Sequence, residues 1–98
     1  MKLPAFLHIG PFKWRVVRTN KADHDEAGYC LTDKHEIGVA KEGDLAGDDE
    51  EASTFVHEWI HAIIAVHFPE IEDDEALTQK LELIVMQSLR YNKTATRA

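Results

Sequence analysis

The chain has 98 residues, of which 44% are hydrophobic and 30% charged, an ordinary composition for a globular protein. This length supports one hydrophobic core, so we expect a single domain over residues 1–98, with residues 1–8 and 92–98 frayed. The 18 acidic and 11 basic residues give a formal charge of −7, which disfavours nucleic acid as a partner. No apolar run approaches the roughly 18 residues of a membrane-spanning helix, so no membrane partner is expected.

A single cysteine, Cys30, excludes an internal disulfide and any metal site made of cysteines alone. It fits a reducing compartment. The first residues are interrupted by Pro4, Gly10 and Pro11 and do not resemble a secretory signal. We therefore expect a cytoplasmic protein. The unusual entry in the composition is histidine, with six residues in 98, against about 2% in typical proteins.

Three short segments in the first half of the chain are typical of strands. Residues 12–18 alternate between apolar and basic side chains, as a half-buried strand does. Residues 29–31 and 36–40 are further strand candidates, and residues 32–35 between them are short enough to close a hairpin. The sequence thus predicts a short antiparallel sheet of about three strands. Two polar segments, residues 20–28 and 41–51, are expected to be loops.

Two helices are predicted in the second half. Residues 52–67 are strongly apolar and lack glycine and proline, which indicates a largely buried helix. Asp48 and Glu51 resemble a capping box at its start, and Pro69 follows its end. Residues 76–91 carry apolar side chains at helical spacing and predict an amphipathic second helix. Because the strands precede the helices, the expected fold class is α+β.

The motif that carries chemistry is His57-Glu58-Trp59-Ile60-His61, an H-E-x-x-H sequence inside the first predicted helix. Four helical steps of about 100° bring the two histidines within about 40° of each other. Both imidazoles then project from one face and can share one Zn²⁺. Glu58 lies on the same side, within reach of a water that it can deprotonate as a general base.

Thr54, His57, Glu58 and His61, with uncharged residues beside the histidines, match the extended zincin signature. The chain resembles the very small zincin metallopeptidases of tailed phages, which are similar in layout to the catalytic cores of the SprT-like and ImmA-like families. The resemblance covers about residues 9–91. It implies a short sheet before the motif helix, a peptide or protein substrate, and host cytoplasm if the chain is phage-encoded. It also implies that the strand at 36–40 is the sheet edge that pairs with substrate.

The third zinc ligand is left open by the residues themselves. His67 lies ten residues after His57, as in metzincins, but Ile64 occupies the place of the glycine that would turn the chain. The resemblance places the third ligand on the following helix, where Glu75 aligns. Further acidic candidates are Glu72, Asp74 and Glu82, of which Glu82 lies two helical turns from Glu75.

The remaining candidates carry less information. We expect the other histidines to lie at the surface or to be hydrogen-bonded locally, and the tryptophans to lie in the core. We leave open a role beside the substrate for His35. The histidines in question are His8, His24 and His35, and the tryptophans are Trp14 and Trp59. Tyr29 and Tyr91 are candidate donors to an oxyanion.

Three functions are compatible with these features. The first is a zinc metallopeptidase in which His57, His61 and Glu75 hold Zn²⁺ and Glu58 is the general base. The second is a catalytically inactive zinc-binding protein of the same fold, with a structural or regulatory role. The third is an acidic decoy that binds a nucleic-acid-binding protein. In so short a chain the cleft should be shallow, which leaves room for a docking protein that completes it.

Overall fold

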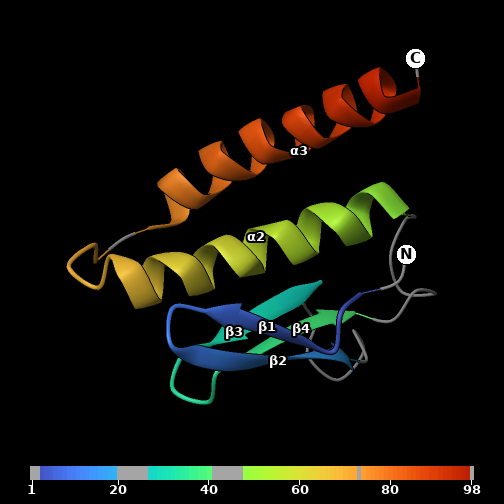
Figure 1. Ribbon diagram of the computed structural model, residues 1–98. Coiled ribbons are helices and arrows are strands. Elements are labelled where there is room, and N and C mark those ends of the chain that lie inside the picture. The colour runs from blue at the N-terminus through green and yellow to red at the C-terminus, as the bar shows by residue number, and fades with distance from the viewer. Residues whose placement is uncertain (1–2, 20–26, 41–47, 73, 98) are drawn as a thin grey trace.

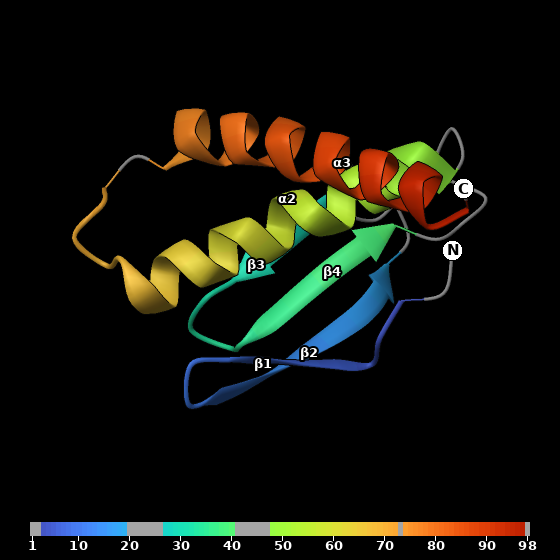
Figure 2. The same ribbon diagram turned by 45° about the horizontal axis from the view of Figure 1, so that its top comes forward.

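A computed structural model describes residues 3–19, 27–40, 48–72 and 74–97 (Figure 1). The elements in chain order are β1 (Phe6–Ile9), β2 (Phe12–Thr19), β3 (Gly28–Leu31), β4 (Glu36–Ala40), α2 (Asp48–His67) and α3 (Glu75–Arg97). Both helices lie on the same side of the sheet, with α2 between the sheet and α3 (Figures 1 and 2). The α+β class is confirmed. No described helix has the length and apolar character needed to cross a membrane.

The sheet is mixed and has four strands in the order β1-β2-β4-β3, so the predicted antiparallel sheet of about three strands is corrected. The predicted hairpin is confirmed, because β3 and β4 pair antiparallel. However, β2 and β4 pair parallel, with Val16 opposite Ile37. All five residues of β4 are buried, which suits a strand with neighbours on both sides. The expectation that 36–40 forms the sheet edge is therefore wrong: among the described strands, β3 is the edge beside α2.

The strand β1 was not predicted, since residues 1–8 were expected to fray. Its residues pair with β2, and Ile9 is only 3% exposed in the core. The glycine and proline that interrupt the sequence pattern form the turn of this hairpin, with Ile9 paired to Phe12 on either side. Gly10 has a φ of 58°, a left-handed conformation that glycine adopts without a steric penalty.

Both predicted helices are present. The first begins at Asp48 and runs through Ile64 to His67, so the expected continuation of the helix past Ile64 is confirmed. The second runs from Glu75 to Arg97 and so continues beyond the expected end at residue 91. Residues 92–97 contain no glycine or proline, so nothing in the sequence stops the helix there. The predicted loop segments 20–26 and 41–47 and the Asp48 side chain of the proposed capping box lie outside the described residues.

Two clusters of buried side chains hold α2 in place. On the sheet side, Phe55 and Ala62 pack with Trp14, Ile37 and Val39, none more than 5% exposed. On the α3 side, a second cluster is formed by Val56, Ile60 and Ile64, against which Leu81, Val85 and Met86 pack. The carboxylate of Glu51, which is 1% exposed, accepts a hydrogen bond of 2.5 Å from the Arg18 guanidinium on β2. The core thus covers two sides of α2 and leaves a third side open.

The buried carboxylate of Glu36 on β4 forms hydrogen bonds with side chains of both neighbouring strands, β2 and β3. It accepts hydrogen bonds from Arg15 of β2 and, at 2.6 Å, from the hydroxyl of Tyr29 on β3. The Tyr29 hydroxyl, followed by Arg15, lowers the pKa of Glu36. Burial, with the bond to Glu36, raises the pKa of Tyr29 to about 12. The Tyr29 ring crosses Gly38, where an added Cβ would lie 2.2 Å from ring atom Cε2.

Replacing Gly38 with alanine should therefore destabilise the protein by about 1–3 kcal/mol, because the methyl group and the Tyr29 ring cannot occupy the same space. Urea denaturation measures the free energy of unfolding. The matched control is the same substitution in a Tyr29→Ala background, where the loss should largely disappear. An equal loss in both backgrounds would contradict the steric explanation.

Candidate metal centre

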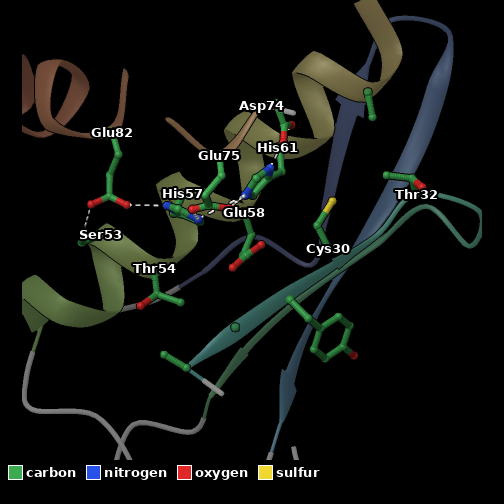
Figure 3. A pocket seen from close by; sticks show the side chains of 14 residues that line it. Cys30, Thr32, Ser53, Thr54, His57, Glu58, His61, Asp74, Glu75 and Glu82 are labelled. Carbon is green, nitrogen blue, oxygen red and sulfur yellow. Dashed lines mark hydrogen bonds and ion pairs between the residues drawn. The ribbon is translucent and has the colours of Figure 1, made fainter. Parts of the chain in front are cut away.

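The open side of α2 presents the motif histidines toward α3 and the edge strand. His57 and His61 are 20% and 17% exposed, and their ring centroids lie 4.8 Å apart at an interplanar angle of 74°. Their Nε2 atoms are 3.2 Å apart. The helical spacing thus has the consequence expected from the sequence, since both imidazoles point a nitrogen into the same small volume (Figure 3).

The first residue of α3 completes this group. Glu75 places Oε1 3.1 Å from His57 Nε2 and Oε2 3.1 Å from His61 Nε2. One ligand atom from each of the three residues can be chosen so that all lie within 4.8 Å of one another. Two imidazole nitrogens and one carboxylate oxygen are a donor set used by catalytic zinc sites, which leave a fourth position open. The residues present therefore fit Zn²⁺ chemically.

The other ring nitrogens also face carboxylates. His57 Nδ1 lies 2.8 Å from Glu82 Oε1, and His61 Nδ1 lies 3.0 Å from Asp74 Oδ2 (Figure 3). The hydroxyl of Ser53 donates to the second oxygen of Glu82 at 2.8 Å. Asp74 and Glu82, weighed from the sequence as alternatives to Glu75, thus contact the opposite nitrogens of the same two rings.

An open cleft of about 740 Å³ lies between α2, the start of α3 and β3. Its polar side chains include His57, His61 and four acidic residues, Glu58, Asp74, Glu75 and Glu82. The described lining residues include no lysine or arginine. Residues 27–30, in β3 and directly before it, form the facing wall, and among the described strands β3 has a neighbour on one side only. Figure 3 shows Cys30 of this strand facing the cleft.

Gly28 explains how Glu58 comes to lie against this wall. A Cβ on Gly28 would be 2.6 Å from Thr54 Cγ2 and 3.2 Å from Glu58 Cγ. Only a residue without a side chain allows β3 and α2 to approach this closely. Gly28 could not be recognised as a site residue from the sequence, because the close approach involves a helix that begins twenty residues later in the chain.

The other candidates lie elsewhere. His67 is exposed at the end of α2, beside Gly10, and Glu72 is also exposed. His35 packs against the rings of Phe12 and Trp14, with centroid distances of 4.7 and 5.1 Å. Trp14 is 1% exposed in the core, as predicted, and Trp59 packs partly buried against the same cluster. The Tyr29 hydroxyl is bound to Glu36; His24 and the Tyr91 side chain lie outside the described part of the chain.

The acidic surroundings shift two groups at the cleft. Burial by itself would lower the pKa of His61, but the hydrogen bond that its ring donates to Asp74 and the charges of Asp74, Glu58 and Glu75 raise it above its usual value. Burial, and then the charges of Glu58 and Asp74, raise the pKa of the Cys30 thiol to about 12. In the metal-free protein, Cys30 is therefore protonated near neutral pH and unsuited to act as a nucleophile.

Comparison with family models, with curated proteins and with solved structures finds no match for this chain. The resemblance to small zincins accordingly rests on the H-E-x-x-H motif and on the order of strands and helices.

In metal-free protein, the pKa of His61 should lie above the usual 6.5 or so, and Asp74→Asn should lower it. NMR titration of the ring protons measures both values. Because the pKa is raised in the folded state, the stability from this pair is complete below the unfolded pKa and is lost as the pH rises through the folded pKa. A pKa that does not respond to Asp74→Asn would contradict the assigned cause.

Proposed function

We propose that this chain is a zinc-dependent metallopeptidase. The observation that carries the proposal is the convergence of His57 Nε2, His61 Nε2 and the Glu75 carboxylate, with distances of 3.1–3.2 Å, in an open cleft that Glu58 also lines. A structural zinc site would use a closed set of four protein ligands. Here the three donors border open space, which suits a site that must admit a substrate.

Glu58 has the position of a general base. It follows His57 directly and lines the cleft between the histidines and the edge strand. Zinc, when bound, supplies a Lewis acid that acidifies water and polarises a peptide carbonyl. Glu58 accepts the proton of the attacking water and later passes it to the leaving amine, a role that requires a carboxylate beside the metal ligands without being one of them.

The edge strand β3 suits an extended peptide as substrate. Its four residues are all partly exposed, and its partner in the sheet lies on one side only among the described strands. A peptide added to this edge would gain main-chain hydrogen bonds while its scissile bond passes the histidines. This assigns to β3 the part that the sequence analysis gave to β4. The acidic lining favours segments that carry basic residues.

The decisive test compares two substitutions in the motif. Glu58→Gln should leave zinc bound and reduce cleavage of an unfolded protein by about 10²–10⁴-fold, because the general base is lost. His61→Ala should lose both zinc and cleavage. Elemental analysis gives the metal content and a fluorogenic casein assay gives the rate. Wild-type protein without zinc would overturn the proposal, whereas bound zinc without cleavage of any peptide would favour the structural or regulatory alternative.

The third ligand is tested by a matched pair of substitutions. Glu75→Ala should weaken zinc binding by about 100-fold or more, since it removes a carboxylate that faces both Nε2 atoms. His67→Ala should leave the affinity unchanged, because this side chain is exposed at the far end of α2. Competition with a chromophoric chelator measures both. Weaker zinc binding in His67→Ala, with unchanged binding in Glu75→Ala, would exclude Glu75 as the third ligand and favour His67.

A further inference from the structure

The acidic residues at the start of α3 contact all four ring nitrogens of the motif histidines. Glu75 faces both Nε2 atoms, Asp74 faces His61 Nδ1, and Glu82 faces His57 Nδ1. We infer that Asp74 and Glu82 are positioning residues, which hold the two imidazoles with a proton on Nδ1 and the Nε2 lone pair directed at the metal. This inference rests on the proposed function and concerns what makes its site selective and tight.

Neighbouring residues contact both side chains of the Glu82–His57 pair. An ionised carboxylate can only accept hydrogen bonds, and His57 Nδ1 lies closer to Glu82, at 2.8 Å, than Nε2 lies to Glu75, at 3.1 Å, so the geometry favours the proton on Nδ1. Neutral imidazole then carries its lone pair on Nε2, the atom nearest to Glu75 and His61. Ser53 donates to the other oxygen of Glu82 at 2.8 Å, which fixes the orientation of the carboxylate. Both His57 and Glu82 are only 20% exposed, so water competes little for this bond.

Asp74 acts on His61 in the same way. Its Oδ2 lies 3.0 Å from His61 Nδ1, with side-chain exposures of 26% and 17%. The completely buried Thr78 places its hydroxyl 3.4 Å from the same His61 Nδ1, and its backbone N–H donates to the Asp74 carbonyl at 2.8 Å. The first turn of α3 thus holds Asp74 in place. Consecutive residues, Asp74 and Glu75, face the two nitrogens of one ring.

The geometry also decides which carboxylate is the ligand. The two Nε2 atoms converge, so an ion between them can bind both histidines together with Glu75. The Nδ1 atoms face separate carboxylates, and an ion at either position would reach one histidine only. Glu82 and Asp74 are therefore not metal ligands in this proposal; they contact each ring at the nitrogen that faces away from the metal. Such carboxylate–histidine contacts set the tautomer and raise the basicity of the metal-bound nitrogen, and their loss typically weakens metal binding by about 10–100-fold.

The alternative is that these contacts only fasten α3 to α2. The apolar contacts of Leu81, Val85 and Met86 with α2 already hold the helix, so the two explanations can be separated. A fastening role would change the melting temperature of the metal-free protein and leave the tautomers and the intrinsic affinity for zinc unchanged. A positioning role predicts the opposite pattern.

The experiment measures zinc affinity and imidazole tautomers in Glu82→Ala and Asp74→Ala, with Glu72→Ala as the control. Glu72 is exposed in the same acidic segment, so its substitution removes the same charge without touching a histidine. Chelator competition should show about 10–100-fold weaker binding for the first two variants and less than about twofold for the control. In metal-free protein, nitrogen-15 NMR should show the Nδ1–H tautomer for both rings, with Glu82→Ala altering His57 and Asp74→Ala altering His61.

Should an alanine variant fail to fold, milder changes are available for each contact: Glu82→Gln or Ser53→Ala for His57, and Asp74→Asn for His61. Each should give a smaller loss in the same direction. Equal zinc affinity and unchanged tautomers in all variants would overturn the positioning role. That result leaves the proposed function standing if wild-type protein binds zinc and cleaves an unfolded substrate. Wild-type protein that binds no zinc would overturn both.

Discussion

The packing of α2 on two sides is the constraint on which the site depends. Phe55 and Ala62 fix the helix on the sheet, while Ile60 and Ile64 fix it against α3. A helix held in this way cannot rotate about its axis without exposing one of the two apolar clusters. The remaining side must therefore face the cleft, and it is the side that carries His57, Glu58 and His61.

The same packing decides where the carboxylates of α3 lie. Leu81 and Val85 of α3 face α2. Glu82 follows Leu81, is rotated from it by one helical step, and therefore faces the cleft. Glu75 lies two turns earlier on that face. Because Glu75 and Glu82 are two turns apart, α3 contacts both ring nitrogens of His57, with Glu75 at Nε2 and Glu82 at Nδ1. The polar geometry at the histidines is thus a consequence of apolar packing.

The predictable part of the structure was the part determined by local sequence. The lack of glycine and proline predicted α2, and helical spacing predicted that His57 and His61 share a face. The strand order could not be predicted from local sequence, because the parallel pairing of β2 with β4 joins segments separated by an intervening strand. Gly10 and Pro11 suggested that regular structure is interrupted at this point, whereas they form the tight turn between β1 and β2, so β1 was not predicted. For the acids, Asp74, Glu75 and Glu82 were competing candidates from the sequence. Only the docking of α3 places Glu75 at the two Nε2 atoms and the other two acids at the Nδ1 atoms.

The arrangement also accounts for the concentration of charge around one pair of histidines. With protons on both Nδ1 atoms, the two Nε2 atoms and the Glu75 carboxylate all present lone pairs to one another across 3.1–3.2 Å. Three acceptors this close repel each other unless a cation lies among them. At low pH, a proton on His61 meets that need, which agrees with the raised pKa of this residue. In the proposed zinc site, a divalent metal would meet that need as well, since it would contact all three donors at once. Protons and metal would then compete for one volume, and the acids that contact the Nδ1 atoms would favour either cation.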